Sequence, residues 1–94
     1  MAKLTYEQRM ELLCDSFPCL RGAAGASPWN PELLCTWYPC ASSGERHVIQ
    51  FVLHVWNSSA DWPCGRFDAM RALQTWSNDN RRAFQAWVAD PWWA

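Results

Sequence analysis

The chain lacks the features that mark several classes of protein. No segment reaches the ~20 apolar residues of a membrane-spanning helix, and the first residues, Met1 to Arg9, turn polar at once. An apolar secretory signal is therefore missing. Eight Lys and Arg face nine Asp and Glu, for a formal net charge of -1, which gives no long-range attraction to nucleic acid or anionic lipid. We expect a cytoplasmic protein that binds neither a membrane nor nucleic acid.

The sequence also lacks the motifs of common catalytic sites. It has no glycine-rich phosphate loop, no strand-turn-helix nucleophile elbow and no pair of carboxylates in an apolar frame. Half of its 94 residues are apolar and only 18% are charged, which is typical of a packed globule whose core takes most of so short a chain. We predict one domain, residues 1–94, without cofactor or enzymatic activity. The alternative is a small enzyme that acts through a cysteine lying close to His47 or His54.

Five cysteines are present, an odd number for which a disulfide framework is not expected in a chain without an export signal. Four residues separate Cys14 from Cys19, and four separate Cys35 from Cys40. Two pairs of soft ligands at equal spacing can close a tetrahedral zinc site. Neither pair has a glycine-rich knuckle, and free cysteines are commonly buried. Core thiols are thus the favoured interpretation, and a zinc-stapled structural or regulatory domain is a second functional hypothesis.

Three helix starts are marked by their capping residues. Thr5 with Gln8, and Ser42 with Glu45, have the spacing of a capping box. Asn30 precedes a proline that suits the first position of a helix. The helices predicted from these starts span residues 5–15, 31–38 and 43–57.

The segment 43–57 is amphipathic. Val48, Val52 and Val55 recur at helical spacing, whereas His47 and Gln50 fall on the opposite face. The β-branched residues also suit a buried strand, but the length of the segment and its capping box favour a helix.

Beyond this helix the sequence repeats itself. The pattern D-x-x-R-A-x-Q-x-W begins at Asp68 and again eleven residues later at Asp79. Between the two copies, Ser77 to Asn80 are capping and turn formers, which predicts two helices meeting at a tight corner. One unbroken helix is the alternative. The fold expected is an all-α, compact bundle of four or five short helices. Its predicted core contains Val48, Val52, Val55, Trp56, Leu73, Trp76, Phe84 and Trp87.

What the chain has in excess is tryptophan, with eight residues. Each can bury on the order of 200 Å², so four or five already make up much of a core this size. The others stand beside prolines in loops or near the last residue, and we expect some to stay exposed. Tryptophan and arginine are the residues most enriched at binding hot spots. The predicted partner-binding residues are Trp29, Trp62, Arg66, Arg81, Trp92 and Trp93.

From about Gly44 onward the chain carries the motifs F-V-L-x-V-W-N, F-D-x-x-x-A-L, R-A-F-x-x-W and D-P-W-W. In these it resembles a set of short, tryptophan-rich bacterial proteins of unassigned function, a resemblance that covers the C-terminal half and implies no chemistry. We therefore predict a non-enzymatic protein-binding module with a protein partner. Phage and mobile-element inhibitors that dock on host complexes, defence systems among them, are small proteins that fit this description.

Overall fold

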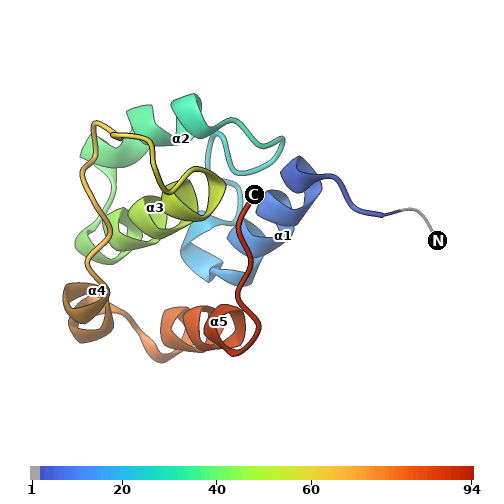
Figure 1. Cartoon of the computed structure of the whole chain (residues 1–94). Coiled ribbons are helices and arrows are strands. Elements are labelled where there is room, and N and C mark those ends of the chain that lie inside the picture. Colours follow the sequence, from blue (N-terminus) through green and yellow to red (C-terminus); the bar gives the residue numbers. More distant parts are fainter. Residues whose placement is uncertain (1–2) are drawn as a thin grey trace.

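Five α-helices and two short 3₁₀ turns make up the computed structural model, which describes residues 3–94 (Figure 1). Within that range there is no strand, so the all-α prediction is confirmed, and no helix is long and apolar enough to cross a membrane. The elements are α1 (Tyr6–Ser16), η1 (Pro18–Leu20), α2 (Pro31–Trp37), η2 (Tyr38–Cys40), α3 (Ser43–Trp56), α4 (Ala69–Thr75) and α5 (Asn78–Ala89).

The predicted capping residues begin α1, α2 and α3. In α1 the Thr5 Oγ1 accepts from the Gln8 backbone N at 3.1 Å, and the Gln8 side chain accepts from the Thr5 N at 2.8 Å. Ser42 and Glu45 repeat this exchange at α3, while the Asn30 side chain accepts from a backbone N–H of α2. These bonds satisfy backbone donors that have no partner within the helix.

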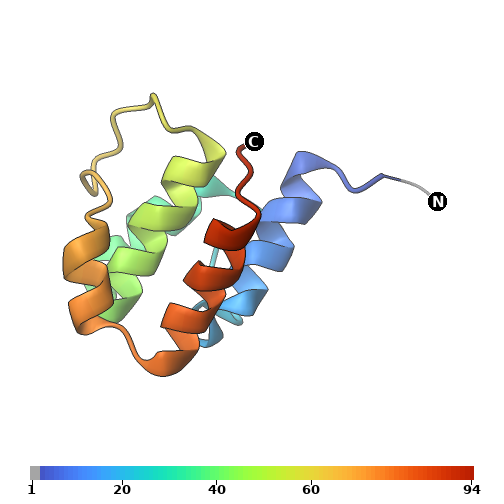
Figure 2. The ribbon, with the colours of Figure 1, turned by 60° about the horizontal axis from the view of Figure 1, so that its bottom comes forward.

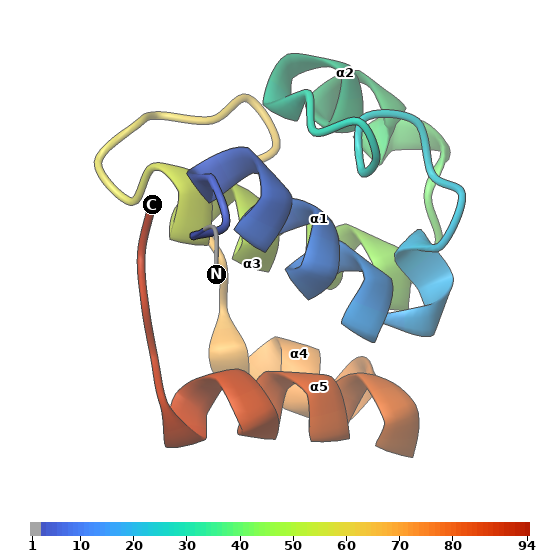
Figure 3. The same ribbon diagram turned by 90° about the vertical axis from the view of Figure 1, so that its right-hand side faces the viewer.

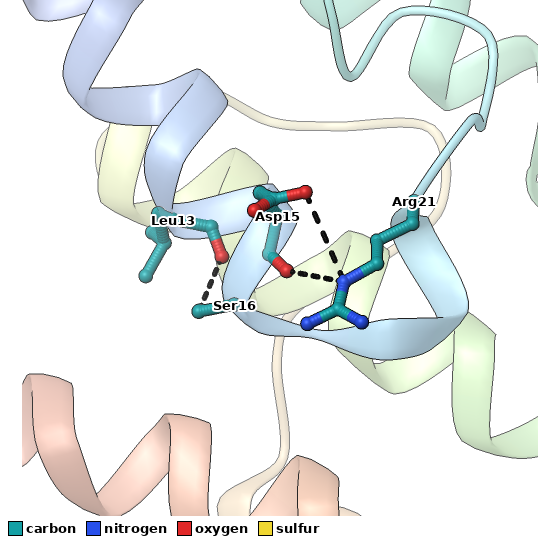
Figure 4. A network of polar contacts seen from close by, with 4 residues as sticks. All are labelled: Leu13, Asp15, Ser16 and Arg21. Atoms are coloured by element: carbon teal, nitrogen blue, oxygen red, sulfur yellow. Dashed lines mark hydrogen bonds and ion pairs between the residues drawn. The ribbon is translucent and has the colours of Figure 1, made fainter.

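The C-terminal end of α1 is closed by polar contacts from nearby residues (Figure 4). The Ser16 hydroxyl donates to the Leu13 carbonyl at 2.6 Å. The Arg21 Nε donates to the Asp15 carbonyl at 3.0 Å and lies 3.8 Å from the Asp15 carboxylate. Because the last carbonyls of a helix have no partner inside it, these contacts allow the chain to leave α1 at Phe17.

α3 is the central helix, and its surroundings correct one prediction. α1, α2 and α4 all pack against it, and every residue from Val48 to Leu53 is buried. Gln50, which the spacing placed on a polar face, is only 9% exposed. Its Nε2 donates to the Cys64 carbonyl at 2.8 Å and to the Tyr38 hydroxyl at 3.4 Å. At Gln50, the loop after α3 and Tyr38 of η2 therefore cover the side of the helix that the pattern assigned to solvent.

α5 joins the core through large aromatic rings. Figure 2 shows α5 running beside α1, in front of α3. The Phe51 ring of α3 contacts Phe84 and Trp87 of α5, each with a centroid separation of 5.1 Å. Phe17 and Phe67 contact the same ring at 5.8 and 5.3 Å. Phe51 is thus the hub of an aromatic cluster that joins α3 and α5 to the segments before η1 and α4.

The predicted core is confirmed in part. Trp76 is buried, and its Nε1 donates to the Gly44 carbonyl at 2.9 Å, which fastens the end of α4 to the first turn of α3. The three valines predicted for the core are buried as well. The remaining predicted residues pack half-buried against it, namely Trp56, Leu73, Phe84 and Trp87.

The corner predicted between the two repeats is confirmed, since α4 and α5 are separate helices. Asp68 caps α4 by accepting from the Arg71 N–H at 3.1 Å. The Arg81 Nε donates across the corner to the Leu73 carbonyl at 3.0 Å. Because the last carbonyls of α4 lack partners within the helix, this bond closes α4 and fixes the start of α5 against it.

Candidate functional site

A groove of about 400 Å³ lies between α1 and α5. On the α5 side, Ala83 and Ala86 contribute small side chains that leave room between the helices. On the α1 side, Leu12 is 57% exposed, while the Ser16 hydroxyl is already bonded within its own helix. The groove thus has an apolar interior. Its lining is completed by Arg9, Leu13, Trp87, Asp90 and Trp92.

The segment after α5 folds back over the end of this groove. The Trp87 Nε1 donates to the Trp92 carbonyl at 3.1 Å, and the Ala94 N–H donates to the Val55 carbonyl at 3.0 Å. Figure 3 shows the segment returning from α5 past α1 toward the end of α3. These two hydrogen bonds hold the backbone of the D-P-W-W segment against α5 and against the end of α3.

The two tryptophans occupy different positions. Trp92 is half-buried at the groove, and the Arg9 guanidinium carbon lies 5.6 Å from its ring centroid, in cation–π contact. Trp93 is 56% exposed and meets the Trp87 ring edge-on at 5.2 Å. Arg9 and Asp90 supply one charge of each sign to the lining.

Trp29 is not an exposed anchor, contrary to the prediction. It is 9% exposed, and its ring packs against Trp56 at a centroid distance of 5.5 Å. Its backbone N–H donates to the Glu11 carboxylate of α1 at 2.9 Å. The loop 21–30 therefore folds against α1 and carries Trp29 into the core. A proline on either side indicated a loop correctly, but did not indicate on which side of the loop the ring lies.

The other predicted binding residues lie elsewhere. Trp62 is half-buried, donates from Nε1 to the Asn57 carbonyl at 3.2 Å, and lines a separate hollow with α2. Arg66 is exposed in a polar pocket between α3 and α4. Arg81 is half-buried and serves the corner between α4 and α5. Of the six predicted residues, Trp92 lines the groove and Trp93 lies beside it, against Trp87.

Apart from Trp92, the residues that line the groove were not predicted as binding residues, Arg9 and Leu12 among them. One signal for Leu12 was present, because it stands next to Leu13 in α1. Neighbouring helical residues point about 100° apart, so two adjacent leucines rarely both face the core. Leu13 is the buried member of the pair.

The four cysteines of the alternative zinc hypothesis, Cys14, Cys19, Cys35 and Cys40, do not converge. Cys14 lies near Cys19, but the close neighbour of Cys35 is Cys64, and Cys40 is exposed. Across residues 3–94 no group of three or more His, Cys, Asp or Glu side chains is placed to hold a metal ion. The equal spacing in sequence therefore does not become a tetrahedral arrangement.

Three thiols have strongly raised pKa values. Burial, with a smaller contribution from neighbouring Cys19, raises the pKa of Cys14 to about 12. Burial likewise raises the pKa of Cys19 to about 11 and that of Cys64 to about 12. These thiols are protonated at neutral pH, whereas a nucleophilic cysteine needs a lowered pKa.

Because these pKa values are raised, we expect the folded protein to become less stable at alkaline pH. Above the ordinary cysteine pKa of 9.0, the unfolded chain releases a proton that folded Cys14 retains. The unfolded state then binds fewer protons, so the free energy of unfolding falls as pH rises. We expect Cys14 alone to account for a loss of about 1.4 kcal/mol between about pH 8 and pH 10. Urea titrations across this range measure it.

The matched control is a buried side chain without a titrating group on the same helix. Cys14→Ala should make the pH dependence shallower by its share of about 1.4 kcal/mol, leaving the part due to Cys19 and Cys64. Met10→Ala, at an equally buried position, should lower stability but keep the full slope. Equal slopes in wild type and Cys14→Ala would show that this thiol is not held protonated by burial.

Comparison of the chain with protein-family models, with curated proteins and with solved structures finds no match. The resemblance to short tryptophan-rich bacterial proteins therefore stays a prediction.

Proposed function

We propose that the protein is a non-enzymatic protein-binding module and that the groove between α1 and α5 is its contact surface. The observation that carries the proposal is the position of the D-P-W-W segment, which holds Trp92 at the groove and leaves Trp93 56% exposed beside it. Exposing a tryptophan ring to water forgoes the stabilisation that burial would give. A partner that covers the ring would recover this stabilisation.

The shape of the groove favours a helical segment of the partner. An amphipathic helix can lay its apolar face between two neighbouring helices, and Leu12 and Trp93 offer exposed apolar surface for such a contact. Arg9 is oriented by the Trp92 ring, and a guanidinium in that position can pair with a carboxylate of the partner. Asp90 offers the opposite charge. Together these residues specify an apolar contact with one charge of each sign.

We also propose a more specific role for the protein, as an inhibitor of a host complex. Small proteins without catalytic motifs include inhibitors from phages and mobile elements that dock on host complexes, defence systems among them, in the cytoplasm. We place this protein in that class. The assignment rests on its size, its lack of catalytic motifs and its exposed aromatic surface.

Capture from a bacterial lysate tests the proposal. The wild type should retain a partner that the double variant Trp92→Ala plus Trp93→Ala loses by tenfold or more, since each aromatic hot spot contributes about 2 kcal/mol. The measurement is quantitative mass spectrometry of the retained proteins.

Trp62→Ala is the control, because it removes a half-buried tryptophan outside the groove. It should retain the same partner as the wild type. Equal recovery by the wild type and the double variant would contradict the proposed surface.

A further inference from the structure

A second pocket, of about 380 Å³, lies between α3 and α4, and its lining is polar and positively charged. Arg46 comes from the first turns of α3, Arg66 from the loop before α4, and Arg71 from α4. The acidic residue of the lining is Asp68. Three arginines against one aspartate give the pocket a charge of about +2, in a chain whose net charge is -1.

The nearest acidic residue on α3 faces another side. The Glu45 carboxylate accepts from the Ser42 N–H at 3.1 Å as part of the capping box. After burial, the Glu45 carboxylate is the next cause that raises the pKa of Cys19, whose thiol lies 3.9 Å from the Asn80 Oδ1 of α5. Glu45 is not part of the pocket lining and forms no ion pair with its arginines within residues 3–94.

Two of the charged groups are already fixed in position. Arg46 donates from Nε to the Tyr38 carbonyl at 3.2 Å and from Nη2 to the Pro39 carbonyl at 2.8 Å, with its guanidinium carbon 5.3 Å from the Tyr38 ring centroid. These contacts use two of its N–H donors, and the rest stay available. Asp68 is occupied by the Arg71 backbone N–H and lies 3.7 Å from the Arg71 Nε.

Two polar groups of the pocket have hydrogen-bonding atoms without a partner in residues 3–94. Arg66 makes no hydrogen bond or ion pair within residues 3–94. The His47 Nδ1 is buried and has no partner in the same part of the chain. Buried polar atoms are nearly always hydrogen-bonded in folded proteins. The Nδ1 atom has no exposed surface, so a ligand in the pocket would bond to it only if the imidazole ring turned.

We propose that this pocket binds the phosphate group of a small phosphorylated molecule. A phosphate monoester is a dianion near neutral pH, which matches the pocket charge, and guanidinium groups bind phosphate through paired N–H donors. Ser43 adds a hydroxyl at the first turn of α3, where the helix dipole also favours an anion. A volume of about 380 Å³ is in the range of small-molecule sites. This site is independent of the groove between α1 and α5.

Titration of the ¹⁵N-labelled protein with glycerol 3-phosphate, at ionic strength held constant with sodium chloride, tests the proposal. We expect saturable NMR shifts at Ser43 to His47 and at the Nε–H of Arg66 and Arg71, complete by about 10 mM ligand. Arg66→Gln should weaken binding by roughly tenfold or more. Because Arg66 is exposed, this variant should fold like the wild type.

Arg82→Gln is the matched control. Arg82 is 3.8 Å from Asp79 on α5, in the same i,i+3 arrangement as Arg71 and Asp68, but outside the pocket. It should change the affinity by less than about twofold. Equal weakening by Arg66→Gln and Arg82→Gln, or shifts that do not saturate, would overturn the site.

A parallel titration with inorganic phosphate separates the two sources of the same chemistry. Glycerol 3-phosphate binding at least as tightly as inorganic phosphate supports a phosphorylated small molecule. Binding of inorganic phosphate alone would overturn that assignment.

Discussion

Gly25→Ala should lower the free energy of unfolding by about 4 kcal/mol, a large part of the stability of a small domain. Gly25 has a φ of +92°, in a region that side-chain-bearing residues rarely adopt. A Cβ there would lie 2.5 Å from the Leu34 N and 2.6 Å from the Asn30 carbonyl oxygen. Both atoms belong to the backbone at the first turn of α2 and cannot swing aside. Urea unfolding followed by circular dichroism measures the loss.

Gly22→Ala separates the clash from the backbone conformation. Gly22 also has a positive φ, +79°, but a Cβ there would meet no atom within 4 Å. The control should therefore lose only about 1 kcal/mol. Equal losses of stability in the two variants would show that the clash of a Cβ at Gly25 with α2 does not cause the destabilisation.

Phe51→Ala should cost about 3–5 kcal/mol and abolish the near-ultraviolet circular dichroism of the packed rings. Phe51 contacts four aromatic rings from three different parts of the chain, two of them on α5. Its removal leaves a cavity that none of these large rings can fill without leaving its own contacts. Chemical denaturation and near-ultraviolet spectra of the same samples measure both effects.

Met70→Ala is the control for Phe51→Ala. Met70 is a large apolar side chain on α4 that is 70% exposed, so its removal should change stability by less than about 0.5 kcal/mol. A comparable loss in the two variants would contradict the central position of the Phe51 ring.

The helices could be predicted from the sequence because their signals are local. Thr5 with Gln8, and Ser42 with Glu45, form hydrogen bonds over three residues, so the spacing alone defines the cap. The corner at Ser77 was indicated by the turn-forming residues Ser77 to Asn80, although the Ser77 side chain makes no capping hydrogen bond. The apolar stripe of α3 likewise identifies one buried face.

Gln50 and Trp29 could not be placed in this way, because their environments come from distant segments. Gln50 is buried by the loop that carries Cys64, and Trp29 by packing against Trp56 and α1. Periodicity within one helix says nothing about a loop that covers its second face. Burial of these residues follows from tertiary packing, which overrides the local pattern.

The candidate site was predicted only in part for the same reason. The D-P-W-W motif indicated Trp92 and Trp93, since two adjacent tryptophans cannot readily both face a small core. The groove beside them depends on α1 and α5, which lie side by side only in the folded chain (Figure 2). No pattern in the sequence indicates that Leu12 and Ala86 line the same groove.

The most direct test of the protein-binding account is the dissociation constant of the captured partner, measured by calorimetry with purified proteins. Leu12→Glu places a charge in the groove at a side chain that is 57% exposed, and Leu33→Glu places the same charge on α2 at one that is 46% exposed. The account predicts that Leu12→Glu weakens binding by roughly a hundredfold while Leu33→Glu leaves it within about twofold. Unchanged affinity in Leu12→Glu would contradict it.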